Sequence, residues 1–159
     1  MPGVLSGVVT LRSEMVFEAT SGSGHTILLD SATDHGGADA GTRPMELLLL
    51  GLGGCTGMDV ISLLRKMRQD VATYQVELQA QRAEEHPRIM REITVTHVIH
   101  GRNLDHKLVQ RAIELSATRY CPASAMLSQA ALIHHRCRLV DTVTGETSEH
   151  AVVDTPLGG

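Results

Sequence analysis

Three cysteines and nine histidines are the side chains of this sequence that could serve as nucleophiles or metal ligands. Cys121 directly precedes Pro122, and because proline favours the first position of a helix, we expect Cys121 at the N-cap. The positive end of a helix favours an anion, which predicts a lowered pKa and more thiolate at Cys121. A thiolate reacts with peroxides and disulfides. The alternative is a small cysteine that merely packs at the cap.

Cys55 lies in an apolar segment between Gly54 and Thr56. Buried cysteines usually pack as small hydrophobic residues, which favours a position in the core. The surrounding glycines, however, would let a ligand or a second backbone approach the thiol closely. Asp59 would share the helix face of Cys55, and a nearby carboxylate raises the pKa of a thiol. Activation of Cys55 would therefore need a cation from elsewhere.

Cys137 lies in the run His134-His135-Arg136-Cys137, which is typical of an alternating strand, so we expect a structural role for it. The histidines are scattered, and none of the CxxC, HExxH or paired Cys/His spacings of zinc sites occurs. The sequence also has no glycine-rich motif for binding phosphate. We therefore expect neither a metal nor a cofactor.

The elements that would position the cysteines follow an α+β order. A long helix is predicted to begin at Pro44, and its four glycines, at about 1 kcal/mol each, favour either close packing of another backbone or a kink. Asn103 is expected to cap the second helix. The predicted strands cover about 8–30, 74–80, 89–99, 133–143 and 147–154, and the predicted helices about 44–68, 104–118 and 122–130.

Composition excludes several classes of function. The 159 residues fit a single domain over 1–159, whose second half, about 73–154, combines strands and helices. An aromatic content of 2% and a net charge of −4 argue against a nucleic-acid surface, which needs exposed rings or a basic face. The apolar run 47–52 is too short to cross a membrane, and no signal peptide is visible. We expect a cytoplasmic protein without a structural disulfide framework.

Two motifs together resemble the OsmC/Ohr family of thiol-dependent peroxide reductases. The first is PMELLL at 44–49 with LGGCT at 52–56, and the second is YCPAS at 120–124, about 65 residues after Cys55. The similarity extends over nearly the whole chain. It implies an intertwined α+β homodimer, in which antiparallel sheets of both chains wrap two long central helices. It also implies that the two active sites lie at the dimer interface.

The resemblance further implies that Cys55 is the peroxidatic thiol and Cys121 the resolving thiol. Cys55 would attack an organic or inorganic peroxide and become a sulfenic acid, which Cys121 would convert into an intrachain disulfide. An external dithiol or lipoyl-type reductant would then restore both thiols.

The activating residues depart from the pattern of the family. Well-characterised members carry a glutamate directly after the proline, paired with an arginine. Here Met45 occupies that position and Glu46 follows, so Glu46 is a candidate catalytic residue and Arg12 and Arg43 are candidates for the arginine. The alternative function is a catalytically weak dimer that binds a small apolar ligand along the Leu- and Met-rich helix, with cysteines that only pack.

Overall fold

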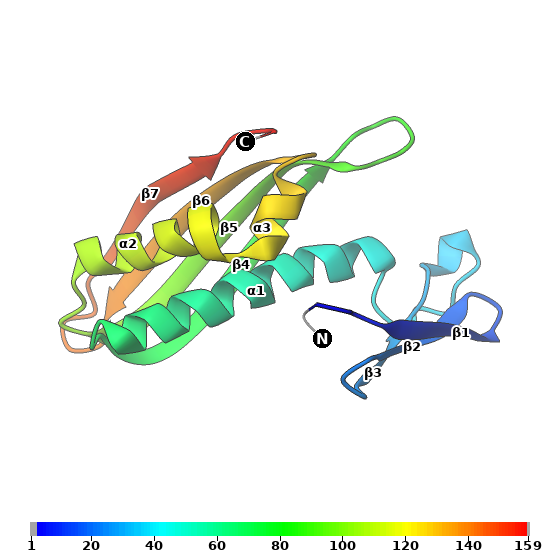
Figure 1. Cartoon of the computed structure of the whole chain (residues 1–159), viewed down its shortest axis with the longest axis horizontal. Coiled ribbons are helices and arrows are strands. Elements are labelled where there is room, and N and C mark those ends of the chain that lie inside the picture. The colour runs from blue at the N-terminus through cyan, green and yellow to red at the C-terminus, as the bar shows by residue number, and fades with distance from the viewer. Residues whose placement is uncertain (1–2, 159) are drawn as a thin grey trace. The chain divides into compact units, whose positions relative to one another are not determined.

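A computed structural model describes residues 3–158 of the chain. Helices and two antiparallel or mixed sheets give the α+β class that the order of elements predicted (Figure 1). The chain divides into two compact units at the bond between Leu48 and Leu49. The organisation of residues 1–159 as one domain therefore stays a prediction.

The first unit is built on a three-stranded antiparallel sheet. Its strands are β1 (Gly7–Ser13), β2 (Val16–Ser21) and β3 (Thr26–Leu29), in the order β1-β2-β3. The strands expected between residues 8 and 30 are thus confirmed. A 3₁₀ turn, η1 (Thr33–His35), follows β3. The Asp30 carboxylate accepts the backbone N–H groups of Ser31, Ala38 and Ala40, and so holds the loop that contains this turn.

The predicted long helix is α1 (Pro44–Lys66), which is one uninterrupted helix without a break at its glycines. A Cβ at Gly53 would lie 2.6 Å from Cδ1 of Leu78, and one at Gly57 would lie 3.4 Å from Cγ2 of Val76. These two glycines therefore make room for side chains of a strand, rather than for the backbone that the sequence led us to expect. At Gly51 and Gly54, no atom of the described residues outside the helix's own backbone and the neighbouring residues lies within 4 Å of such a Cβ.

The apolar segment is much longer than the run 47–52 on which the sequence-based expectation rested. The whole of α1 has 23 residues and a mean hydropathy of 1.8 over an 18-residue window, of which 28% is buried. By length and composition alone it could cross a membrane. The core helix of a soluble protein can have the same length and composition, so these two properties do not distinguish a core helix from a membrane-spanning one.

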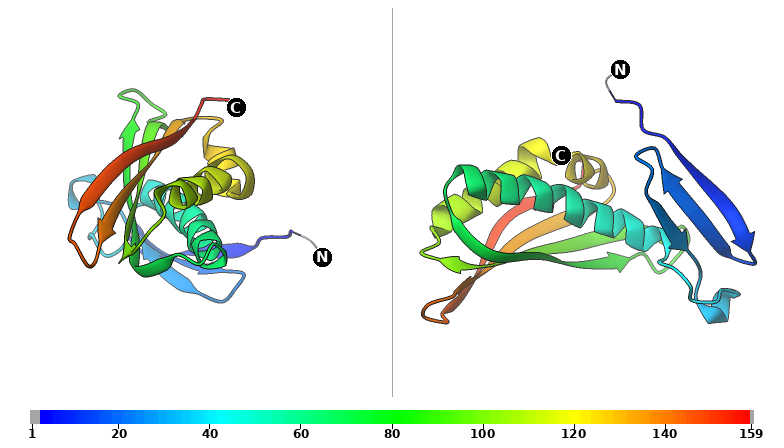
Figure 2. Two further views of the ribbon diagram at one scale, coloured as in Figure 1. Left: turned by 90° about the vertical axis from the view of Figure 1, so that its left-hand side faces the viewer. Right: turned by 90° about the horizontal axis from the view of Figure 1, so that it is seen from below.

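A four-stranded sheet dominates the second unit. Its strands β4 (Asp70–Arg82), β5 (Met90–Arg102), β6 (Leu132–Asp141) and β7 (Thr147–Thr155) lie in the order β4-β5-β6-β7. The predicted hairpin of β4 and β5 is confirmed, and β5 and β6 are parallel. Helices cover one face of the sheet (Figure 2). There Val60 and Leu64 of α1 pack with Ile99, Val109 and Ile113 in a fully buried core.

The connection from β5 to β6 carries three helical segments: α2 (His106–Leu115), a π-helical turn η2 (Ser116–Tyr120) and α3 (Pro122–Leu127). The expected cap at Asn103 is wrong. Asp105 caps α2, because its carboxylate accepts the N–H groups of Lys107 and Leu108 at 2.9 and 3.2 Å. Asn103 instead adopts a φ of +50° in the preceding turn, a conformation that asparagine tolerates.

Candidate functional site

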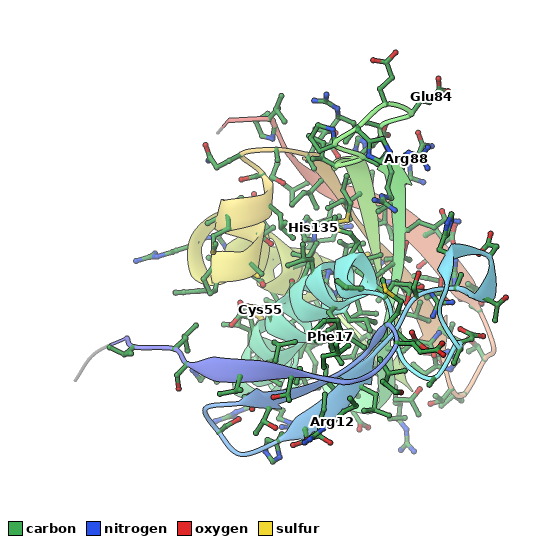
Figure 3. All side chains as sticks on the ribbon, turned by 90° about the vertical axis from the view of Figure 1, so that its right-hand side faces the viewer. Arg12, Phe17, Cys55, Glu84, Arg88 and His135 are labelled. Atoms are coloured by element: carbon green, nitrogen blue, oxygen red, sulfur yellow. The ribbon has the colours of Figure 1, made fainter. Side chains whose placement is uncertain are left out.

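The two candidate thiols come from different helices of the second unit and interact with each other. Cys55 is half-buried on α1 (Figure 3), whereas Cys121 is 3% exposed at the N-cap of α3, as predicted. The Cys121 Sγ accepts the backbone N–H of Ser124 at 3.3 Å. The thiol of Cys55 lies close enough to raise the pKa of Cys121. Helix packing thus brings together two thiols that are 66 positions apart in the sequence.

The pKa of Cys121 is raised, so the lowered pKa that we expected from its N-cap position is wrong. Burial of the thiol raises the pKa most, and Cys55 adds to that effect. The hydrogen bond from the backbone N–H of Ser124 acts in the opposite direction but does not offset the burial. The end of a helix contributes only about 0.3–1 kcal/mol at an exposed site, and α3 has just six residues. Desolvation therefore outweighs the effect of the helix.

A buried hydrogen-bonded network anchors the turn that carries Cys121 to α1. The Ser116 hydroxyl donates to Oδ2 of Asp59 at 2.9 Å and lies 2.8 Å from the Thr56 hydroxyl. The carbonyl of Ser116 accepts the N–H of Cys121 at 2.9 Å. Asp59, which the sequence placed beside Cys55, is thus engaged with η2. Sequence reasoning missed Ser116, because no local signal distinguishes a π-helical turn from the continuing helix.

Ser116→Ala is expected to lower the free energy of unfolding by about 1–3 kcal/mol, because the buried Thr56 and the half-buried Asp59 side chains lose their shared partner. Urea denaturation measures this change. Ser62→Ala, at an exposed position of α1, is the matched control and should stay within about 0.5 kcal/mol of the wild type. Equal midpoints for the two variants would show that the network does not anchor the turn.

A second buried polar row crosses the sheet beneath α1. The Tyr74 hydroxyl lies 2.6 Å from Nδ1 of His97, whose Nε2 lies 3.5 Å from Nδ1 of His135 (His135 is labelled in Figure 3). Among residues 3–158, Nε2 of His135 finds no hydrogen-bond partner. Burial lowers the pKa of His97 to about 3 and that of His135 to about 4, and it raises the pKa of Tyr74. All three side chains are therefore neutral near pH 7.

The spacing of these histidines along the sequence predicts no shared site. The strand phase offered a signal, because His97 shares the buried face of β5 with Ile93, Val95 and Ile99. Within residues 3–158, no group of three or more His, Cys, Asp or Glu side chains could hold a metal ion. Cys137 lies in the hydrophobic core, and burial raises its pKa to about 11.

The candidate activating residues lie in the first unit, whereas Cys55 lies in the second. The Glu46 carboxylate accepts the Thr42 hydroxyl and the backbone N–H of Arg43, both at 2.9 Å, at the start of α1. These bonds, led by that from Arg43, lower the pKa of Glu46. The side chain of Arg43 pairs with Asp39 at 2.6 Å, and Arg12 pairs with Glu18. The carboxylate and both guanidinium groups therefore already have partners within their own unit.

Comparisons with known proteins agree on one family. A family model described as OsmC-like protein matches residues 36–136. Protein YhfA from Escherichia coli K12 is 40% identical over 126 residues, which cover 79% of this chain and 91% of YhfA. The crystal structure of a hypothetical protein from Aquifex aeolicus VF5 superposes with a TM-score of 0.77 at 30% identity, over 87% of this chain and 98% of that one.

A more distant structure has the same fold. It is an organic hydroperoxide resistance protein from Elizabethkingia anophelis, with a TM-score of 0.62 at 14% identity, over 89% of this chain and 99% of that one. At such low identity the likeness shows the fold alone.

Proposed function

Because the chain belongs to the family of OsmC-like proteins, we propose that it is a thiol-dependent peroxidase that reduces organic or inorganic peroxides. The nearness of Cys55 to Cys121, which is sufficient to raise the pKa of Cys121, carries this proposal. A peroxidase that works through a disulfide needs a second thiol within reach of the first. The alternative, a dimer that binds a small apolar ligand, gives no reason for two thiols from separate helices to meet.

In the proposed reaction, the Cys55 thiolate attacks one peroxide oxygen, the O–O bond breaks, and the leaving alcohol or water takes up a proton. Cys55 becomes a sulfenic acid. The Cys121 sulfur then attacks the Cys55 sulfur, an intrachain disulfide forms, and the sulfenic oxygen leaves as water. The N–H of Ser124 points at the Cys121 sulfur and stabilises the negative charge that develops there. A dithiol or lipoyl-type reductant, oxidised to its own disulfide, returns both cysteines to thiols.

The proposal gives Glu46 a structural role at the start of α1. Glu46 caps the N-terminus of α1 through Thr42 and Arg43, an arrangement close to the capping box that fixes the start of a helix. Any direct action of Glu46 on the peroxide is a further proposal, which a fall in kcat of Glu46→Gln without loss of stability would support. A cytoplasmic location also belongs to the proposal, because cysteines there stay reduced.

We propose in addition that the protein works as a homodimer. Within the second unit, which begins at Leu49, one face of α1 is not covered, with Leu50 56% and Met58 74% exposed on either side of Gly54. A Cβ at Gly51 or Gly54 would meet no atom within 4 Å, so a second helix could approach closely there. A second copy of this chain would cover the apolar face, as the family resemblance implies.

Met58→Asp is expected to weaken this dimer by at least about 100-fold in its dissociation constant, because a buried, unpaired charge costs several kcal/mol. Sedimentation velocity across a concentration series measures the change. Gln75→Asp, at an exposed position of β4, is the matched control and should remain dimeric. A wild-type protein that sediments as a folded monomer at micromolar concentration would contradict the proposed assembly.

Peroxide consumption tests the proposed function directly. Purified protein is mixed with an added dithiol and either cumene hydroperoxide or hydrogen peroxide, and the loss of each peroxide is followed. Turnover that needs both protein and dithiol supports the proposal, and the ratio of the two rates gives the substrate preference. Consumption no faster than with dithiol alone, for both peroxides, would overturn it.

A further inference from the structure

A cavity of about 250 Å³ opens beside Cys121 on a side to which α1 contributes no lining residue. Its walls come from η2, α3 and the end of β7. Small and apolar groups form most of the lining, among them Ala117, Ala125 and Pro156. Since Cys121 is 3% exposed, a reagent would reach its sulfur through a cavity such as this one.

The cavity carries one cation, Arg119. Its guanidinium carbon lies 5.6 Å from the centroid of the Tyr120 ring, and within residues 3–158 no carboxylate forms an ion pair with it. The acid in the lining, Asp154, is already engaged, because its Oδ1 lies 2.8 Å from Nδ1 of His134. Arg119 is therefore available to a negatively charged group of a ligand.

We propose that this cavity admits the reductant: a low-molecular-weight thiol with a short aliphatic body and a carboxylate, which attacks Sγ of Cys121. The proposal rests on the proposed function, since it assigns the step that regenerates the enzyme. The apolar walls would hold the aliphatic body, and Arg119 would bind the carboxylate.

The chemistry is a thiol–disulfide exchange. The reductant thiolate forms a bond to Sγ of Cys121, the Cys55–Cys121 bond breaks, and Cys55 leaves as a thiolate that is protonated by water. A second thiol then attacks the sulfur of the bound reductant, which releases Cys121 and the oxidised reductant as a disulfide. One disulfide is reduced to two thiols, and two reductant thiols are oxidised to one disulfide.

The lining of the cavity favours attack on Cys121 over attack on Cys55. The cavity includes Cys121 but no residue of α1, the helix that carries Cys55. A thiol held in the cavity therefore contacts Cys121, and Cys55 is the sulfur that departs.

The first test uses protein whose disulfide has been formed with diamide, so that peroxidase activity is not needed. The disulfide is reduced with 3-mercaptopropionate or 2-mercaptoethanol at equal thiolate concentrations. We expect the carboxylate to accelerate reduction about threefold to fivefold, as one partly exposed ion pair would. Peptide mass spectrometry after an acid quench should find the mixed disulfide on Cys121. Equal rates, or a mixed disulfide on Cys55, would overturn the proposal.

Variants test whether the reductant reaches Cys121 through the cavity, by comparing rates of reduction for changes inside and outside its lining. Ala125→Leu fills the cavity and should slow reduction by both thiols at least tenfold, whereas Ala130→Leu, an exposed alanine outside the lining, should not. Arg119→Gln should remove the preference for the carboxylate, whereas Arg111→Gln, on the exposed side of α2, should keep it. A cavity variant that behaves like its control would contradict the assignment.

A second test does not depend on a Cys55–Cys121 disulfide. Cys55→Ser protein is treated with the symmetrical disulfide of 3-mercaptopropionic acid, which should modify Cys121 and leave the core residue Cys137 free. Adding Ala125→Leu should slow this modification at least tenfold, and an unchanged rate would overturn the cavity proposal. A protein that shows these rates but consumes no peroxide would contradict the proposed function and still support the cavity.

Discussion

Cys55→Ser is expected to abolish peroxide turnover, with a loss of at least about 10³-fold in kcat, because it removes the attacking sulfur. Cys121→Ser should still react once with peroxide. The sulfenic acid on Cys55 would then persist or be oxidised to the sulfinic acid, because no neighbouring thiol resolves it. The asymmetry between the two variants defines which thiol attacks and which one resolves.

Dimedone labelling followed by peptide mass spectrometry measures this asymmetry. We expect label on Cys55 in the Cys121→Ser protein and none in the Cys55→Ser protein. Cys137→Ala, which changes the cysteine of the hydrophobic core, is the matched control and should keep full turnover per folded molecule. Label on Cys121 in the Cys55→Ser protein, with none on Cys55 in the other variant, would show that the two roles are reversed.

The second large effect is a loss of stability in mild acid. His97 and His135 are buried and neutral, with pKa values of about 3 and about 4, whereas an unfolded histidine titrates near 6.5. Below pH 6.5 the unfolded chain therefore binds protons that the folded chain refuses, and stability falls as the pH falls. Two such groups give a slope of about 2.7 kcal/mol per pH unit, which is large beside a total stability of about 5–15 kcal/mol.

Chemical denaturation at a series of pH values between 4.5 and 6 measures this slope. The window lies above the range in which Asp30, Glu46 and Asp141 act. Backbone N–H groups lower the pKa values of these carboxyl groups, so the stability that they contribute is lost mainly below about pH 4.5. The window also avoids His134, whose pKa is raised by Asp154, so its contribution is lost only above pH 6.5.

His97→Gln should reduce the slope to about 1.4 kcal/mol per pH unit, because one of the two titrating groups is gone. Gln75→Asn, at an exposed position of β4, removes no titrating group and should leave the slope of the wild type unchanged. A stability that stays flat from pH 6 to 4.5 in the wild type would contradict the assignment of two buried neutral histidines.

Local signals in the sequence were enough for most of the fold. Pro44 marks the start of α1, and the alternation from Tyr74 to Ala80 locates β4, since these patterns depend on neighbouring residues only. The cap of α2 shows where local signals fail. Asn103 and Asp105 are both good caps, and the turn, which places Asn103 at φ +50°, leaves the cap position to Asp105.

The electrostatics of the site depend on packing that no local pattern records. The sequence placed Cys121 correctly at the start of a helix, but the sign of its pKa shift follows from burial, which tertiary contacts decide. The link from Ser116 to Asp59 joins positions 57 apart in the chain, and it requires a π-helical turn that resembles ordinary helix in sequence. Such contacts could be found only from the folded chain.

The central claim is that Cys55 and Cys121 form a reversible intrachain disulfide. Mass spectrometry after one equivalent of peroxide, with free thiols alkylated before digestion, tests it most directly. The account predicts one Cys55–Cys121 bridge, an alkylated Cys137, and complete return to three thiols on addition of a dithiol. Three free thiols after peroxide, or a bridge that includes Cys137, would contradict it.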